Sequence, residues 1–115
     1  MAPESMRFAL SEVLSGMLAS SQHDRFTDDH ARLVTMFEDL AGQFSLFAPL
    51  AAAIDANAVS AALNDLAQNG FLQHEGDIYI LTDIGRAHCV RSKRTLFNQR
   101  DIEQLEQTAT VFDSL

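Results

Sequence analysis

Residues 50–86 read LAAAIDANAVSAALNDLAQNGFLQHEGDIYILTDIGR, and this stretch decides the fold of the chain. Its first five residues predict a short helix that Pro49 opens, because the fixed φ of proline suits the first turn of a helix. A turn at 55–57 follows, in which Asn57 is expected to cap a second helix with its side chain. In that second helix the apolar residues recur at the spacing of one helical face: Val59, Ala62, Leu63 and Leu66.

The second half of the stretch predicts a helix end and a β-hairpin. Gly70 is expected to end the second helix as a residue with positive φ. Two extended runs, 71–74 and 77–81, then flank Glu75-Gly76, which leaves room only for a very tight turn. Thr82 is expected to cap the helix that follows the hairpin.

This order of helix, turn, helix and hairpin resembles the winged helix-turn-helix. The resemblance is carried by four motifs: L-A-x-x-I at 50–54, V-S-x-A-L-x-x-L at 59–66, N-G-F-L at 69–72 and Y-x-L-T-x-x-G-R at 79–86. MarR-type and PadR-type regulators are similar over this span, which is about the middle third of the chain. The resemblance implies a mainly α fold with a small β-hairpin, and a DNA-binding function that the residues must support separately.

The segment before the stretch predicts further elements. An apolar stripe over 3–20 is widened by additional apolar residues, so this helix should be buried on more than one side, with a second subunit as one cover. Thr27 is expected to cap the next helix, with acidic residues in its first turn, and Gly42 to end it. Residues 44–47 alternate like a short strand that would join the edge of the hairpin sheet.

The segment after the stretch is helical, either as one continuous helix or as two helices broken near 92–98. A continuous helix would align an apolar face made of Ile84, Ala87, Arg91, Ile102, Leu105, Ala109 and Phe112. Leu96 and Phe97 fall off that face and would then pack on a partner. The organisation expected is one domain over 1–115, with an N-terminal helix at 3–20, helix-turn-helix and wing at about 28–82, and a C-terminal helical region at 83–112.

Charge is distributed unevenly along the 115 residues, whose net charge is −8. Residues 86–100 hold five basic residues and no acidic one, whereas the rest of the chain holds three basic residues and all sixteen acidic ones. Either this segment is a solvated helix of ordinary surface charge, or it forms an electropositive patch on an acidic body. On a continuous helix, Arg86, Lys93 and Arg100 would form one stripe, because they recur every seven residues.

The second helix of the helix-turn-helix is the candidate recognition helix. Its outward face would consist of Asn57, Ala61, Asn64 and Gln68, flanked by Ser60 and Asp65. Asparagine and glutamine can pair with adenine edges in the major groove, and alanine can contact a thymine methyl group. Phosphate contacts would come from the basic segment, through Arg86, Lys93, Arg94 and Arg100. The first hypothesis is therefore a small dimeric DNA-binding transcription regulator that pairs through its N- and C-terminal helices.

The predicted hairpin tip supports a different function. Glu75, Gly76 and Asp77 make it short and acidic, so phosphates would repel it. The recognition face also lacks basic residues, and its amides could equally be an ordinary solvated surface. The second hypothesis is therefore a winged-helix module that binds protein, as an adaptor or an antagonist of a DNA-binding protein.

Catalysis and cofactors find little support in the sequence. It has no glycine-rich phosphate loop, nucleophile elbow or set of metal-binding cysteines, so no enzyme, cofactor or metal is expected. Residues 23–30, HDRFTDDH, are explained by helix capping. Cys89 lies near basic residues and is either a thiol of lowered pKa that senses oxidation or an inert apolar residue. With no disulfide and no long apolar segment, the chain is expected to be cytoplasmic and not membrane-bound.

Overall fold

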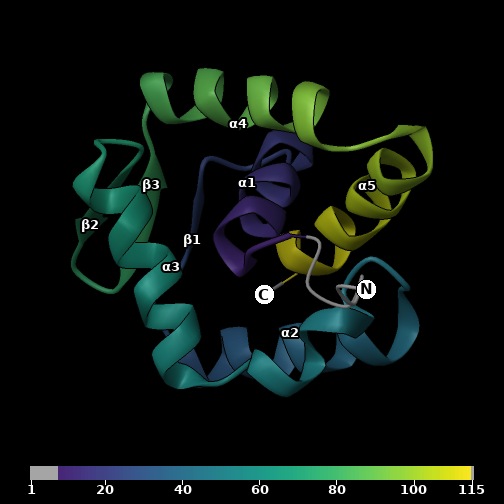
Figure 1. The fold of residues 1–115 in the computed structure, drawn as a ribbon. Coiled ribbons are helices and arrows are strands. Elements are labelled where there is room, and N and C mark those ends of the chain that lie inside the picture. Colours follow the sequence, from purple (N-terminus) through teal and green to yellow (C-terminus); the bar gives the residue numbers. More distant parts are fainter. Residues whose placement is uncertain (1–7, 115) are drawn as a thin grey trace.

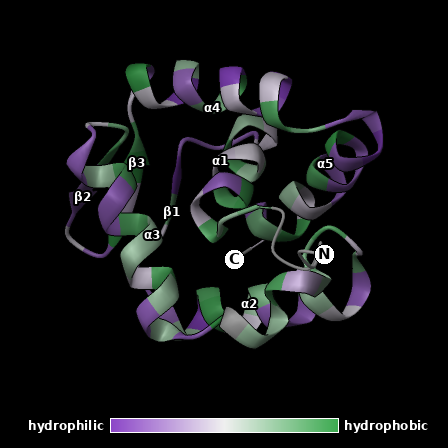
Figure 2. Cartoon of the chain, viewed as in Figure 1, coloured by the Kyte–Doolittle hydropathy of each residue, from purple (hydrophilic) through white to green (hydrophobic). Residues whose placement is uncertain are grey.

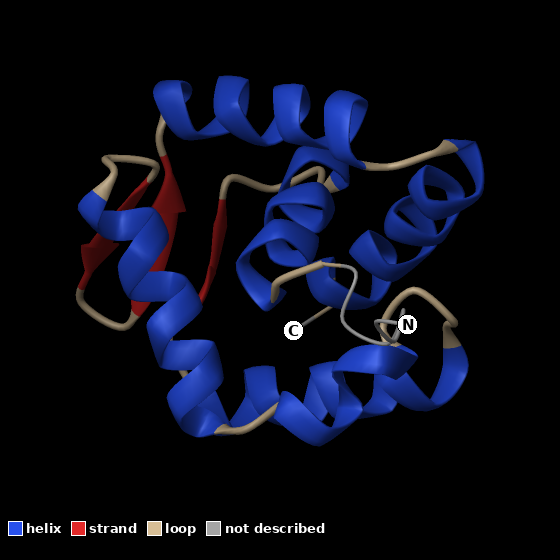
Figure 3. Ribbon diagram, in the orientation of Figure 1, coloured by secondary structure: helices blue, strands red, loops and turns tan. Residues whose placement is uncertain are grey.

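A computed structural model describes the protein over residues 8–114, apart from the side chain of Ala53 (Figure 1, Figure 3). It is mainly helical, with one small antiparallel sheet. In chain order the elements are α1 (Leu10–Ser20), β1 (Arg25–Thr27), α2 (His30–Gln43), the 3₁₀ helix η2 (Ala48–Ala53), α3 (Ala56–Gln68), β2 (Leu72–Glu75), β3 (Ile78–Leu81), α4 (Asp83–Leu96) and α5 (Gln99–Asp113).

The sheet has the strand order β1-β3-β2, with β3 in the centre. Tyr79 of β3 lies opposite Phe26 on one side and His74 on the other. The hairpin turn is Gly76-Asp77, so β2 lies one residue later than the predicted run 71–74, and β3 begins one residue later than predicted but ends at Leu81 as predicted. The third strand is β1, which follows α1 directly.

The strand predicted at 44–47 is wrong. Phe44 donates its N–H to Leu40 O at 2.8 Å, and Ala48 donates to Phe44 O at 3.1 Å, so the chain continues through turns of helical type. Phe47 is completely buried in this turn. The alternation seen in the sequence therefore reflects burial at the end of α2 and not the pleat of a strand.

Helix α1 lies in the middle of the molecule and packs against α3, α4 and α5. The predicted burial on more than one side is found, and the covering elements are the domain's own helices. The helix begins at Leu10, with Ala9 as its N-cap. Phe8 and Ala9, which were predicted to be helical, therefore lie outside it. The remainder of the predicted start, 3–7, lies outside the described residues.

Two helix caps differ from the prediction. Asp29 caps α2 by accepting from the N–H groups of Ala31 and Arg32, whereas Thr27 belongs to β1. Asp55 caps α3 by accepting from the N–H of Ala58 at 2.8 Å. Asn57 cannot cap α3, because it already lies inside this helix. Helix α2 also continues to Gln43, one residue beyond the predicted end.

The C-terminal region consists of two helices, which is the second of the two alternatives predicted from the sequence. Helix α4 ends at Leu96, Phe97 turns into the core, and Asn98 caps α5 by accepting from the N–H of Asp101 at 2.8 Å. Thr82 caps α4 as predicted, by accepting from the N–H of Gly85. Gly70 has the predicted positive φ, +80°, a conformation that glycine adopts without a steric cost.

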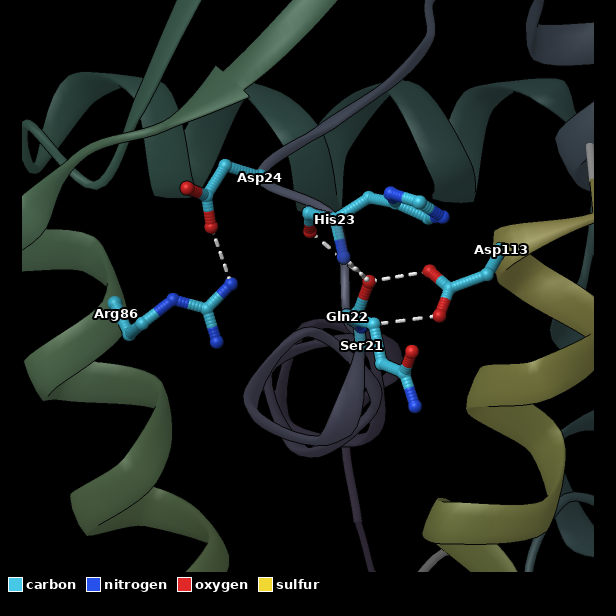
Figure 4. A network of polar contacts seen from close by, with 6 residues as sticks. All are labelled: Ser21, Gln22, His23, Asp24, Arg86 and Asp113. Atoms are coloured by element: carbon cyan, nitrogen blue, oxygen red, sulfur yellow. Dashed lines mark hydrogen bonds and ion pairs between the residues drawn. The ribbon is translucent and has the colours of Figure 1, made fainter.

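The segment between α1 and β1 fixes both C-terminal helices (Figure 4). Gln22 donates its N–H to Asp113 Oδ2 at 3.0 Å, and the hydroxyl of Ser21 donates to the other oxygen of that carboxylate. Two residues later, Asp24 accepts from Arg86 Nη2 at 2.5 Å. Through these contacts α5 and α4 are held to the end of α1. None of the helices described has both the length and the apolar character needed to cross a bilayer.

Candidate nucleic-acid interface

The outer face of α3 is polar and open to solvent. Asn57, Ala61, Asn64 and Gln68 are exposed, and Ser60 is half-buried. The predicted inner face is confirmed, since Val59, Ala62, Leu63 and Leu66 are all buried. The core thus fixes the rotation of α3 about its axis and turns the three amide side chains outward.

The hairpin tip is short and acidic. Glu75, Gly76 and Asp77 are exposed, and the turn itself has only two residues. Its backbone is also tied to the start of α2, because Asp28 donates its N–H to Asp77 O at 3.0 Å. Carboxylates in this position would repel a phosphate backbone, so the hairpin supplies no attractive contact to DNA.

The predicted basic stripe does not form. Helix α4 ends before Arg100, which lies in the first turn of α5 and so leaves the row of Arg86 and Lys93. Arg86 is paired with Asp24 at 2.5 Å, and Lys93 Nζ lies 3.5 Å from Glu106 Oε2. These two cations therefore already neutralise carboxylates of their own domain.

Three other cations of the basic segment remain available for a partner. Arg91, Arg94 and Arg100 are exposed, and within residues 8–114 none of them takes part in an ion pair. Arg91 and Ile84 were predicted to lie on the apolar face of a continuous helix. This part of the prediction is wrong, because Arg91 is exposed and the side chain of Ile84 is 68% exposed. The break at Phe97 is the cause, because it lets the apolar side of α5 face the core without turning these α4 residues inward.

A groove of about 370 Å³ separates the end of α3 from α4 and α1. Asp65 of α3 and Asn69, which follows this helix, line one side of it, and His88 and Ser92 of α4 line the other. The ring of His88 stacks on Phe71, with 4.0 Å between the ring centroids. The side of α3 that faces α4 is therefore polar and partly acidic, and among the described residues neither lysine nor arginine lines the groove.

The thiol of Cys89 is completely buried between α4 and α1. Burial raises the pKa of Cys89 to about 11, and this effect outweighs both a hydrogen bond with Ser15 and the positive charge of Arg86. Of the two alternatives predicted for Cys89, the thiol of lowered pKa is therefore wrong, because burial raises the pKa more than the neighbouring cation lowers it, and the structure agrees with the buried apolar residue.

This raised pKa should make stability fall at alkaline pH. The thiol ionises near pH 9.0 when exposed and near pH 11 when folded, so the stabilising effect is complete below pH 9 and is lost as the pH rises toward 11. Between about pH 8.5 and pH 10.5 the free energy of unfolding should drop by roughly 1–2 kcal/mol more than in Cys89→Ala. Urea unfolding at both pH values measures the difference, and parallel losses in the two proteins would contradict it.

One histidine and one carboxylate form a side-chain pair beside the sheet. His74 Nε2 lies 2.7 Å from Asp28 Oδ2, which links β2 to the loop before α2. Among residues 8–114, no group of three or more histidine, cysteine, aspartate and glutamate side chains could hold a metal ion.

The chain was also compared with known proteins. Neither the models of protein families, nor the curated proteins, nor the solved structures contain a match to it.

Proposed function

We propose that this protein is a winged-helix DNA-binding transcription regulator, with α3 as its recognition helix. The observation that carries the proposal is the exposed amide-rich face of α3 on a helix whose other side is core. The element order supports it, since a short helix and a turn precede α3 and a hairpin follows. So does the sheet, in which the strand after α1 pairs with the second strand of the hairpin.

The residues proposed to read DNA are those of the outer face of α3. Asn64 and Gln68 lie one turn apart and can each form two hydrogen bonds to an adenine, while Ala61 can contact a thymine methyl group. Asn57 and Ser60 would contact bases or phosphates at the start of the helix. This face contributes specificity and no charge attraction.

Phosphate attraction would come from Arg91, Arg94 and Arg100, because Arg86 and Lys93 are already paired inside the domain. Each phosphate neutralised contributes about −0.9 to the slope of log K against log salt, so one domain should show a slope of about −3 or shallower. We therefore propose a regulator whose affinity depends on base contacts more than on its charge.

The proposal is tested by selecting duplexes from genomic fragments at about 50 mM salt, where electrostatic attraction is strong. Asn64→Ala should lower the affinity for the selected sequence about tenfold and relax the preference at one base pair. Gln107→Ala, an exposed glutamine of α5, is the matched control and should bind normally. Fluorescence anisotropy measures both, and the absence of any selected duplex would remove the proposal.

A second candidate function is binding of a protein partner, as an adaptor or an antagonist of a DNA-binding protein. The acidic hairpin tip, with Glu75 and Asp77 exposed, favours it, because such a surface attracts basic segments. Affinity purification of the protein from its cell extract, with nuclease treatment, separates the two functions. Recovery of nucleic acid without any protein partner would contradict the second.

A further inference from the structure

Helix α4 has an outer face that no described element covers. It runs along the upper edge of the molecule in Figure 1, and green and purple segments alternate along it in Figure 2. Three of the four large apolar side chains exposed among residues 8–114 belong to this helix: Ile84 at 68%, Val90 at 37% and Leu96 at 41%. Leu96 lines the groove beside α3, whereas Ile84 and Val90 face outward with the exposed arginines.

The outer residues of α4 follow the spacing of a helix–helix seam. Asp83, Ala87, Val90 and Arg94 are separated by four, three and four residues, and all four are exposed. This is the alternation of the two core positions in a coiled coil, which keeps one stripe of side chains facing a partner helix. The stripe has an acid at its first position, a base at its last and two apolar residues between them.

We propose that a second copy of this chain docks on α4, with the two α4 helices antiparallel. In that arrangement Asp83 lies opposite Arg94 of the second copy, and Ala87 lies opposite Val90 of the second copy. Because Arg94 is then neutralised within the dimer, the phosphate attraction proposed above would come from Arg91 and Arg100 of each copy. Two-fold symmetry repeats both layers, so every layer of the seam is either apolar or oppositely charged. A dimer is expected from the sequence, and this inference names its contact surface. It rests on the proposed function for its biological meaning, whereas the contact itself needs no DNA.

Charge selects this orientation over the parallel one. Parallel helices would place Asp83 against Asp83 and Arg94 against Arg94, which is unfavourable at both ends. Within residues 8–114 neither side chain has an ion-pair partner, so both are free to pair across the dyad. The small side chain of Ala87 allows close approach at the centre, and Ile84 can cover the aliphatic stem of Arg91 of the second copy.

The cations on the flank of α4 do not oppose this contact strongly. Arg86 would lie near Lys93 of the second copy, and Lys93 near Arg86 of the second copy, but Asp24 and Glu106 of the same domain already neutralise these cations. The seam is short, because the 14 residues of α4 span only about 21 Å. An interface of this size is smaller than that of a stable complex, so we expect a dissociation constant of about 10–100 μM.

The apolar centre of the seam is tested by sedimentation equilibrium of the full chain without DNA. Val90→Glu should raise the dissociation constant of the dimer about tenfold or more, because it buries a carboxylate at the centre of the seam. Val111→Glu is the matched control, since Val111 is 41% exposed on α5 and lies off the seam, and it should self-associate as the unsubstituted protein does. Circular dichroism verifies that both variants fold.

The orientation is tested by exchanging charges. Asp83→Arg and Arg94→Asp each place like charges at both ends of the seam, so each alone should weaken the homodimer about tenfold, since two pairs reverse together. An equimolar mixture of these two variants should form a heterodimer, because its layers are again complementary. The doubly substituted chain should recover the homodimer.

Some results would overturn the inference. One is an unsubstituted protein that stays monomeric at about 0.5 mM, which is well above the expected dissociation constant. Another is equal weakening of the dimer by Val90→Glu and Val111→Glu. The third is a failure of the two charge variants to form a heterodimer when they are mixed. Failure of the DNA proposal would be seen separately, because Asn64→Ala lies on α3 and leaves this seam unchanged. If the protein dimerises but does not bind DNA, the inferred α4 contact stands and the proposed regulator function is contradicted.

Discussion

Replacing Gly85 by alanine should destabilise the protein by about 3 kcal/mol. A Cβ atom at this position would lie 2.1 Å from the carbonyl oxygen of Phe71 and 2.8 Å from its carbon. These are backbone atoms, so no side-chain rotation relieves the clash. The carbonyl is moreover fixed by Thr82, whose N–H donates to it at 3.1 Å and whose hydroxyl donates at 3.2 Å. The hairpin and α4 would have to move apart.

Urea unfolding followed by circular dichroism measures this loss. Gly42→Ala is the matched control, because Gly42 is also helical but has no atom within 4 Å of the added carbon. It should stabilise the protein by about 0.5–1 kcal/mol, as expected when alanine replaces glycine in an open helical site. A loss below about 1 kcal/mol for Gly85→Ala would show that α4 does not contact Phe71 so closely.

Replacing Phe47 by alanine should cost about 3–5 kcal/mol of stability. The ring is completely buried between α2 and η2, with its centroid 6.3 Å from that of Phe37. Truncation would leave a cavity that neighbouring helices cannot fill without moving, so the lost burial is only partly recovered.

The same unfolding measurement compares Phe47→Ala with Gln43→Ala, which removes an exposed side chain at the end of α2 and should change stability by less than about 0.5 kcal/mol. Similar small effects of the two substitutions would contradict the burial of Phe47.

The features that the sequence predicted correctly depend on local signals. The buried face of α3 follows from four apolar residues at helical spacing, and Thr82 was identified because its hydroxyl precedes a helical stretch. Gly70 ends α3 because its positive φ lets Phe71 donate its N–H back to Leu66 O at 3.0 Å. Each of these depends on residues at most a few positions apart.

The features that it missed depend on contacts between distant segments. Strand β1 has only three residues, and it is extended because it pairs with β3, more than fifty positions later. The ion pair of Arg86 with Asp24 joins residues 62 positions apart. The sequence alone therefore does not show which basic residues remain unpaired and available for a partner. For the cap of α3, Asp55 and Asn57 were both suitable residue types, and only the backbone conformation decides between them.

The position of α1 has a consequence for the synthesis of the chain. This helix comprises residues 10–20, yet the elements that cover much of it are α4 and α5, which extend to residue 113. At roughly 5–20 residues per second, a ribosome completes α5 about 5–20 seconds after α1 has been translated. During that interval the sides of α1 that α4 and α5 cover have no partner, so nascent chains stalled before residue 99 should bind chaperones that full-length chains escape.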